Sequence, residues 1–346
     1  MQSIGIDLGA KQSHLVLAND QAPMQTLSLP TATLGAWLRT QPRSRVVMET
    51  CTQSRAVARA ALAAQHETLV VPSTVVRALG VGRRGIKTDK RDAEVLATAG
   101  LRNPDLPSVY LRRPDTEAKR ALLSARQVLI EGRTRLVLHL KSTLRGRLVV
   151  LRATPSAASF ATSVRDALLA TAEGISVGDE AILAALTAMT AQIEQLDDQL
   201  ATLVKCDDTC QRMMTMPGIG PVISLALSTH LEDPNRFRSA EALGSYMALV
   251  PGESTTGGNI HRTGTLRAGP GHLKSLMIQA AWTMWRSRPG DPVVVWARAL
   301  ADRRGRRIAI VALARKMTII LWAMWKAGRP YQPDKAVCPK ESHTPT

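Results

Sequence analysis

The pattern of apolar and polar positions along residues 1–100 predicts an alternation of strands and helices. Short apolar and β-branched runs (SIGIDLG, SHLVLAND and the residues around Leu27) predict three successive strands. The segments that follow predict a helix (TLGAWLRT), a strand (SRVVMET), a helix (SRAVARAALAAQ), a strand (ETLVVPS) and a helix that contains TDKRDAEVLATAG. Three early strands followed by alternating strands and helices indicate a layered α/β domain.

Helical periodicity prevails in the rest of the chain. Residues 115–150 predict one long basic helix. A later helix carries apolar residues at alternating spacings of four and three: Ile182, Leu186, Met189, Ile193, Leu196, Leu200 and Leu203. This spacing is a heptad seam with an acidic outer face. It fits a coiled coil between copies of the chain or a pair of helices within one copy.

A glycine-rich turn separates two further helical runs. Gly218 and Gly220 lie in the sequence PGIG, which predicts either a simple turn between helices or the hairpin of a helix-hairpin-helix. In the second case, backbone N–H groups at the turn would bind a phosphate. A Gly- and Thr-rich loop follows over residues 252–272, and then come apolar helices. Their tryptophans fall at helical spacing, and we expect them in the core: Trp282, Trp285, Trp296, Trp322 and Trp325.

The composition indicates a polyanionic partner. The chain has 346 residues, 45% of them hydrophobic, which is enough for two cores. It carries 45 Lys and Arg against 28 Asp and Glu, a formal charge of +17. From Arg77 to Arg147 there are 17 basic and 7 acidic residues, whereas residues 178–210 have 7 acidic residues and one Lys. This contrast separates a nucleic-acid-binding face from an acidic helix.

Other classes of protein fit the sequence less well. The four cysteines are too few and too scattered for a disulfide framework, and Cys206 and Cys210 have no second ligand pair for zinc. Arg315 and Lys316 interrupt the C-terminal apolar stretch before it reaches the roughly 20 residues of a membrane span. Because Met1 leads directly into a strand, we expect a cytoplasmic protein without a membrane partner.

Four carboxylates are the strongest candidates for catalysis. Asp7 and Glu49 each end a short apolar run, where a strand presents its last side chain to a cleft. Asp89 and Asp92 are three residues apart in a helical segment and therefore share one face of the helix. Carboxylates that converge in this way usually surround a hard cation such as Mg²⁺. In so basic a chain, this indicates metal-dependent phosphodiester chemistry on nucleic acid.

Five longer motifs carry a resemblance to a known family. They are GIDLGAK, VVMETCTQS and GIKTDKRDAEVLA in the first half, and MPGIGPVISLALSTHLEDPNRFRSAEALGSYMALVPGE and GHLKSLMIQAAW in the second. Over roughly residues 1–330 the chain resembles the DEDD transposases and recombinases of bacterial insertion sequences of the one-ten type, to which the pilin-gene invertases belong. The resemblance implies an α/β RNase H-like (RuvC-like) domain over 1–148, long basic helix included. It also implies a helical linker and coiled coil over 149–205, a mostly helical transposase domain over 206–332 and a flexible tail over 333–346.

The resemblance also implies a reaction. Asp7, Glu49, Asp89 and Asp92 would hold Mg²⁺, or Mn²⁺ in its place, while a serine in the second half attacks a DNA phosphate. Strands would be exchanged through a covalent protein–DNA intermediate, and a bridge RNA would select the donor and target DNA. Exchange of four strands requires a dimer or tetramer. The expected contacts to nucleic acid are Lys87, Arg133, Arg135, Lys141, Gly218 and Gly220.

The chain departs from the family pattern at the nucleophile. Thr256 occupies the position of the family's serine, and Ser254 lies two residues earlier. Three alternatives stay open: attack by Thr256, attack by Ser254 after a local shift of register, and an impaired strand-transfer site. Two other functions also stay open, a RuvC-like hydrolytic nuclease or junction resolvase and an inactive nucleic-acid-binding relative.

Overall fold

The computed structural model describes residues 2–79, 89–151, 155–256, 259–265 and 269–336. The chain divides into two compact units, residues 1–112 and residues 113–346, and each is described here by itself. The long basic helix packs within the second unit, and the predicted domain boundary after residue 148 stays a prediction. Its apolar residues meet those of later helices, and these contacts between distant segments are not visible in the sequence.

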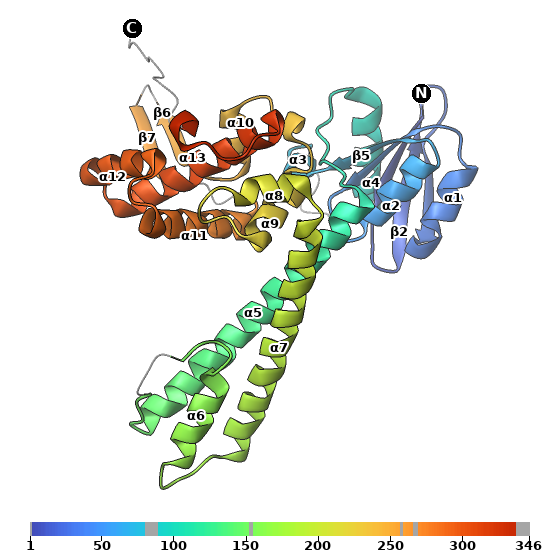
Figure 1. The fold of residues 1–346 in the computed structure, drawn as a ribbon. Coiled ribbons are helices and arrows are strands. Elements are labelled where there is room, and N and C mark those ends of the chain that lie inside the picture. The colour runs from blue at the N-terminus through green and yellow to red at the C-terminus, as the bar shows by residue number, and fades with distance from the viewer. Residues whose placement is uncertain (1, 80–88, 152–154, 257–258, 266–268, 337–346) are drawn as a thin grey trace. The chain divides into compact units, whose positions relative to one another are not determined.

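The first unit is built on a mixed five-stranded sheet (Figure 1). Its strands follow in space as β3-β2-β1-β4-β5, with bounds β1 Ser3–Asp7, β2 Gln12–Ala18, β3 Gln25–Pro30, β4 Arg45–Glu49 and β5 Glu67–Val71. Strand β1 pairs antiparallel with β2 and parallel with β4, and β4 pairs parallel with β5. The predicted order of strands and helices is confirmed, and so is the α/β class of this domain.

Helices cover both faces of this sheet. They are α1 Leu34–Thr40, preceded by the short 3-10 helix Thr31–Thr33, α2 Ser54–Ala63, α3 Ser73–Ala78 and α4 Asp89–Arg102. On one face, Ile4 and Ile6 pack with residues of α1 and α2. On the other face, Val16 packs with Ala93 and Ala97 of α4. Alternation of side chains along the strands assigns each residue to one of these layers.

Helix α4 lies directly against the backbone of β1. A Cβ atom on Gly5 would come within 2.1 Å of the Ala93 carbonyl oxygen and 2.3 Å of the Ala97 nitrogen. Gly100, further along α4, lies against Ser3 and Val47 in the same way. Glycine at both positions therefore permits a close approach that any larger residue would prevent. Helix α4 runs antiparallel to β1, so its first residues lie at the carboxyl end of that strand.

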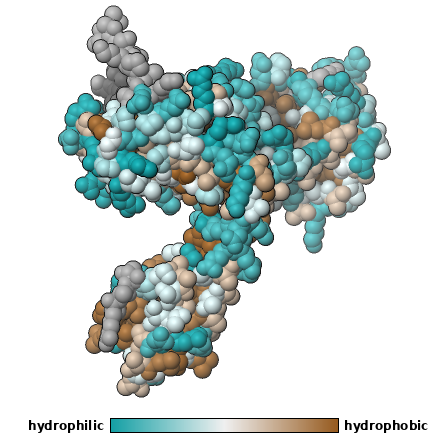
Figure 2. Space-filling view, in the orientation of Figure 1, coloured by the Kyte–Doolittle hydropathy of each residue, from teal (hydrophilic) through white to brown (hydrophobic). Residues whose placement is uncertain are grey.

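The second unit begins with a long helical hairpin, formed by α5 Pro114–Gly146 and α7 Val177–Lys205 with the shorter α6 Phe160–Leu169 beside them (Figure 1). The two long helices are antiparallel: Arg126 Nη2 lies 3.1 Å from Asp197 Oδ2, and Arg147 Nη2 lies 2.8 Å from Asp179 Oδ2. Figure 2 shows a hydrophobic surface at the far end of the hairpin. The exposed apolar residues of this end include Leu148, Val150, Leu169 and Val177.

The predicted heptad seam lies on the buried side of α7. Leu186, Ile193 and Leu200 of that seam are buried, and the predicted residues between them are half-buried. Leu183, Thr190 and Val204 complete the buried stripe. It is broader than a two-position seam because α7 contacts α5, α6, α8 and α9 in turn. A helix pair within one chain is therefore present, and a coiled coil between copies stays a prediction.

The rest of the second unit is mostly helical, as predicted. The elements are α8 Asp208–Met214, α9 Pro221–Leu231, the 3-10 helix Pro234–Arg236, α10 Ala240–Tyr246, β6 Pro251–Thr256, β7 Asn259–Thr265, α11 Gly271–Ser287, α12 Pro292–Arg304, α13 Arg306–Ala327 and α14 Pro333–Ala336. Their apolar side chains form one core together with Leu123 of α5 and Leu200 of α7. The five tryptophans named above are partly buried against this core, which confirms their predicted role.

Strands β6 and β7 correct the prediction of a loop over residues 252–272. They form an antiparallel hairpin in which Ser254 pairs with His261 and Thr256 with Asn259. The glycines and threonines of this segment give it the composition of a loop. A hairpin is held together by backbone hydrogen bonds between its two strands, and these bonds do not require alternating apolar side chains.

One described helix, α13, is long and apolar enough to cross a membrane, by length and composition alone. In this structure Leu313, Met317 and Leu321 of α13 are fully buried in the core of the second unit. Buried core helices can have the same length and apolar composition, so the composition of α13 is weak evidence for a membrane span.

Candidate functional site

Two of the predicted carboxylates lie side by side at one edge of the sheet. Asp7 is the last residue of β1 and Glu49 the last residue of β4. These strands are parallel neighbours, and Ile6 pairs with Met48 immediately before the two acids. The strands of a sheet are about 4.8 Å apart. Asp7 and Glu49 are therefore neighbours at the carboxyl edge, and each is half-buried.

Strand alternation places both acids on the face that α4 covers. Asp7 is two residues from Gly5, which lies against Ala93 of α4. Glu49 is two residues from Val47, which packs with Leu96 of α4. Residues two apart in a strand share one face of the sheet. The side chains of Asp7 and Glu49 therefore emerge on the side of the sheet where α4 begins.

Helix α4 contributes the third carboxylate. Asp92 is only 6% exposed and immediately precedes Ala93, the residue whose carbonyl lies against Gly5. A carboxylate buried to this degree requires compensation by hydrogen bonds or by opposite charge. Asp92 and Asp7 each take part in at least one hydrogen bond or electrostatic interaction. The structure thus brings Asp7, Glu49 and Asp92 to the same face and the same end of the sheet.

The structure describes Asp89, the fourth carboxylate, only in part, and it does not describe Lys87, a predicted contact to nucleic acid. Asp89 is the first residue of α4, one helical turn before Asp92, but its side chain lies outside the described residues. Lys87 lies outside the described residues altogether. Among the side chains that the structure describes, no group of three His, Cys, Asp or Glu is close enough to hold a metal ion. The side chain of Asp89 is not among these described side chains.

Cys206 and Cys210, the two cysteines that are close in sequence, do not belong to any group of three potential metal ligands among the described residues. Cys206 is exposed, whereas Cys210 is buried in the core, and burial raises the pKa of its thiol to about 11. The two cysteines therefore lie in different environments.

The PGIG turn connects α8 and α9. Gly218 has a φ of +86°, and a Cβ there would lie 2.5 Å from the Ala280 carbonyl oxygen of α11. The close packing of the turn against α11 is therefore enough to require glycine at position 218. Gly220 precedes α9, and a Cβ at that position would meet no atom within 4 Å. The turn is thus tightly packed at Gly218 and open at Gly220.

The predicted basic residues of α5 differ in accessibility. Arg135 and Lys141 are exposed, and Arg133 is half-buried. The Lys141 ammonium lies 6.0 Å from the centre of the Phe160 ring. Basic residues on this helix therefore remain available to a polyanion, while Arg126 is engaged with Asp197.

The candidate nucleophiles lie on β6 in the second unit. Ser254 and Thr256 are both strand residues, but their side chains lie outside what the structure describes. The carboxylates belong to the first unit and the hydroxyls to the second. The predicted assembly of both into one active site remains a proposal.

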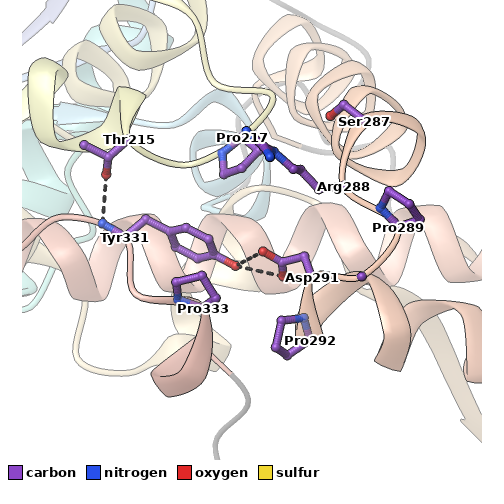
Figure 3. A pocket seen from close by; sticks show the side chains of 10 residues that line it. Thr215, Pro217, Ser287, Arg288, Pro289, Asp291, Pro292, Tyr331 and Pro333 are labelled. Carbon is purple, nitrogen blue, oxygen red and sulfur yellow. Dashed lines mark hydrogen bonds between the residues drawn. The ribbon is translucent and has the colours of Figure 1, made fainter.

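A pocket in the second unit was missed by the sequence analysis (Figure 3). It has a volume of about 630 Å³, and its walls include Pro217 of the PGIG turn. The Tyr331 hydroxyl lies 3.0 Å from both carboxylate oxygens of Asp291, and its backbone N–H donates to the Thr215 hydroxyl. Burial and the Asp291 carboxylate raise the pKa of Tyr331 far above its usual value. Because these residues are distant in sequence, no local pattern points to them.

Glu232 was also missed. It is 8% exposed and follows α9 with a φ of +61°. One of its oxygens accepts hydrogen bonds from the Arg113 backbone N–H at 2.9 Å, the Arg113 Nε at 3.0 Å and the Thr116 hydroxyl at 2.8 Å. Burial raises the pKa of Glu232, but these hydrogen bonds outweigh burial and hold the pKa below its usual value. The Asp-Pro pair that follows Glu232 was the only local signal of a special turn.

Comparison with known families is consistent with this geometry. Residues 4–148 match a model for IS110-type DEDD transposases, and this match contains Asp7, Glu49, Asp89 and Asp92. Residues 210–292 match the model described as "Transposase IS116/IS110/IS902 family", which contains the PGIG turn, Ser254 and Thr256. The two matches thus cover both of the regions that carry candidate site residues.

Individual relatives have transposase names. The chain is 26% identical to a "Probable family 20 transposase" of Pseudomonas aeruginosa, over 96% of this chain and 99% of that protein. It is 25% identical to the "Transposase for insertion sequence element IS1328" of Yersinia enterocolitica, over 94% of this chain and 97% of the relative. It is 27% identical to the "Transposase for insertion sequence element IS1111A" of Coxiella burnetii, over 71% of this chain and 68% of that protein. The chain belongs to the IS110-type DEDD transposase family.

Proposed function

We propose that this chain is the transposase of an insertion sequence and that it cuts and transfers DNA strands in a reaction that depends on a divalent metal ion. The observation that carries the proposal is the placement of Asp7, Glu49 and Asp92 on one face at the carboxyl edge of the sheet. Membership of a transposase family supports DNA as the substrate. The strand order with β1 at the centre and α4 across it supports an RNase H-like (RuvC-like) fold.

The carboxylates fit a hard cation. Asp7, Glu49, Asp89 and Asp92 would supply only oxygen ligands, which Mg²⁺ and Mn²⁺ prefer. Gly5 permits the close approach of α4 that carries Asp92 toward the end of β1. When bound, the cation would stabilise negative charge that develops on phosphate oxygens. The carboxylates themselves concentrate negative charge at the sheet edge, which favours a cation there and keeps an unaccompanied phosphate away.

The attacking group in this proposal is a hydroxyl of β6, with Thr256 preferred over Ser254. Its oxygen loses a proton and forms a bond to phosphorus while the bond from phosphorus to the DNA 3′ oxygen breaks, and the leaving 3′ oxygen gains a proton to become a 3′-hydroxyl. Attack by a 3′-hydroxyl on the protein–DNA phosphodiester then rejoins the strands and restores the side-chain hydroxyl. Threonine carries a β-methyl group that restricts χ1. We therefore expect Thr256→Ser to keep or raise the rate of adduct formation.

Further parts of the proposal concern partners. The basic face of α5 and the open N-terminus of α9 at Gly220 would contact donor DNA, target DNA or a bridge RNA. Strand exchange needs several nucleophiles, which supports a dimer or tetramer, and the seam of α7 would contribute a coiled coil to it. The protein would act in the bacterial cytoplasm, where its DNA substrates lie.

Covalent trapping tests the proposal. Purified protein is incubated with Mg²⁺ and a nicked DNA that carries one end of the insertion sequence, and protein–DNA adducts are digested and identified by mass spectrometry. We expect an adduct on Thr256 that is lost in Thr256→Ala and retained in Ser254→Ala. An adduct on Ser254 would reverse the assignment. Free DNA ends without an adduct would show a hydrolytic nuclease, and intact DNA would show a binding protein only.

A further inference from the structure

Four exposed arginines surround the connection between α12 and α13. The sequence from 302 to 307 reads DRRGRR, and the structure exposes Arg303, Arg304, Arg306 and Arg307. Over residues 286–307 the chain has seven arginines against two aspartates. This arginine-rich surface was not among the nucleic-acid contacts that the sequence analysis expected.

The connection between the helices gathers these arginines at one end. Gly305 alone separates α12 from α13, with a φ of +85° that favours glycine. The two helices then lie side by side (Figure 1), and the Lys316 ammonium of α13 lies 4.5 Å from the centre of the Trp296 ring of α12. The last turn of α12 and the first turn of α13 are therefore neighbours, and their arginines share one small region.

Positive charge exceeds negative charge in this region, since residues 302–307 contain four arginines and one acid, Asp302. None of the four arginines forms an ion pair with a described residue, and Arg303 only donates to the Ala299 carbonyl oxygen at 3.4 Å. The first turn of α13 contains no acidic residue, and its N-cap has no side-chain hydrogen bond. Positive charge at a helix N-terminus is unfavourable because it adds to the positive end of the helix dipole. A bound polyanion would relieve both this effect and the mutual repulsion.

A hollow of about 620 Å³ adjoins the same arginines. It is lined by Trp285, Arg298, Ala301, Asp302 and Arg306. The Arg298 guanidinium lies 5.3 Å from the centre of the Trp285 ring and donates to the Trp285 carbonyl oxygen at 3.3 Å. Stacking on an indole holds a guanidinium in place while its remaining N–H groups stay accessible. The wall of the hollow therefore contains the stacked Arg298, the exposed Arg306 and one acid, Asp302.

We propose that Arg298, Arg303, Arg304, Arg306 and Arg307 form a binding surface for the sugar–phosphate backbone of nucleic acid. Guanidinium groups bind phosphate oxygens through paired hydrogen bonds as well as through charge. Backbone contacts position a nucleic acid without reading its sequence, so this surface binds different sequences equally well. The inference rests on the proposed function, because it assumes a protein that acts on DNA, and it adds a surface distinct from α5 and the PGIG turn.

Binding measurements with the full-length protein test the surface. The probes are a labelled duplex DNA and a labelled structured RNA, both of arbitrary sequence, titrated over a range of KCl concentrations. The test variant is Arg304→Gln with Arg306→Gln and Arg307→Gln. The matched control is Lys205→Gln with Arg238→Gln and Arg329→Gln, which removes three exposed positive charges elsewhere in the same unit. Circular dichroism confirms that each variant is folded.

The test variant should bind at least about tenfold more weakly than the control near physiological salt. Its plot of log affinity against log salt should be shallower, by about 0.9 for each lost contact on duplex DNA and about 0.7 on single strands. Loss on one probe alone assigns the surface to that nucleic acid. Equal binding by test variant and control overturns the inference but leaves the proposed function intact. If the wild-type protein binds neither probe, the proposed function itself fails.

An anionic lipid surface is the competing polyanion, because the apolar helix α13 follows these arginines directly. Sedimentation with vesicles of phosphatidylcholine and phosphatidylglycerol tests it. We expect no difference between wild type and test variant. Vesicle binding that the three substitutions abolish, with binding of nucleic acid unchanged, would assign the surface to lipid and overturn the inference.

Discussion

Two sets of acidic residues, one in each unit, are placed differently. In the second unit, Asp179, Asp197 and Glu232 each contact an arginine, namely Arg147, Arg126 and Arg113. In the first unit, Asp7, Glu49 and Asp92 lie on one face of the sheet at the same edge. Acids that meet opposite charges stabilise a fold, whereas acids that converge on one another repel and favour a bound cation.

The comparison teaches how to separate the two roles by experiment. Neutralising a paired acid in the second unit removes hydrogen bonds and lowers the free energy of unfolding. Neutralising one of the acids at the sheet edge of the first unit should relieve repulsion and remove a proposed metal ligand. The two kinds of substitution should therefore change stability in opposite directions, and only the second should abolish chemistry.

The largest effect on activity is expected from substitutions of the carboxylates at the sheet edge of the first unit. Asp7→Asn or Asp92→Asn should reduce DNA cleavage in Mg²⁺ by at least about 100-fold, because each removes a charged ligand from the proposed metal site. The melting temperature of the metal-free protein should stay the same or rise. Gel assays of cleavage and thermal melts in EDTA measure the two quantities. Glu94→Gln, an exposed acid on the same helix, is the control. Cleavage that persists in EDTA would contradict the proposal.

A new acid without a partner should strongly destabilise the second unit. Ile193 is 3% exposed on the buried side of α7. Ile193→Asp should lower the free energy of unfolding by more than about 3 kcal/mol, since it buries a charge and removes apolar contacts. Denaturant unfolding followed by circular dichroism measures this loss. Gln192→Asp, exposed on the same helix, should have little effect. A smaller species in sedimentation with helicity retained would instead indicate a seam between copies.

Removal of the paired charge at Glu232 should have an intermediate effect. Glu232→Gln should destabilise the protein by about 2 kcal/mol at neutral pH, because the bonds from Arg113 and Thr116 lose their charged acceptor. The pKa of Glu232 is lowered in the folded state. Its contribution is therefore complete above the unfolded pKa of about 4.3 and is lost as the pH falls through the folded pKa. Unfolding of both proteins between pH 7 and pH 3 measures the difference, which should shrink with acidification. Glu194→Gln, an exposed acid, should show no such trend.

The smallest effect is expected at the start of α7. Ser176 and Asp179 form a capping box, and the Ser176 hydrogen bonds together with Arg147 lower the pKa of Asp179. Asp179→Asn should destabilise the hairpin by about 1 kcal/mol. Hydrogen exchange of the first turn of α7 measures the local loss. Asp198→Asn, exposed on the same helix, is the control. A larger loss at Asp198 than at Asp179 would show that the cap is unimportant.

Several features of the second unit were beyond prediction from sequence. The β6–β7 hairpin has the glycine and threonine content of a loop, and its register shows no apolar alternation. Glu232 meets Arg113 across more than one hundred residues, and Tyr331 meets Asp291 across forty. The arginines of the α12–α13 connection stand out only when exposure and missing ion pairs are known. Contacts between distant residues depend on packing, which local patterns do not contain.

The sequence by itself determined that Asp7 and Glu49 each end a strand of the first unit, because strand periodicity is local. It also determined that Asp89 and Asp92 share a helix, since residues three apart lie on one face. Only the tertiary structure decided that α4 lies against β1 and points its first turn toward Asp7. That decision rests on Gly5, whose missing side chain lets the helix touch the strand. The tertiary structure also decided that the seam of α7 packs against α5 of the same chain. An apolar stripe on a helix specifies that this side is buried, but it does not specify which element covers it.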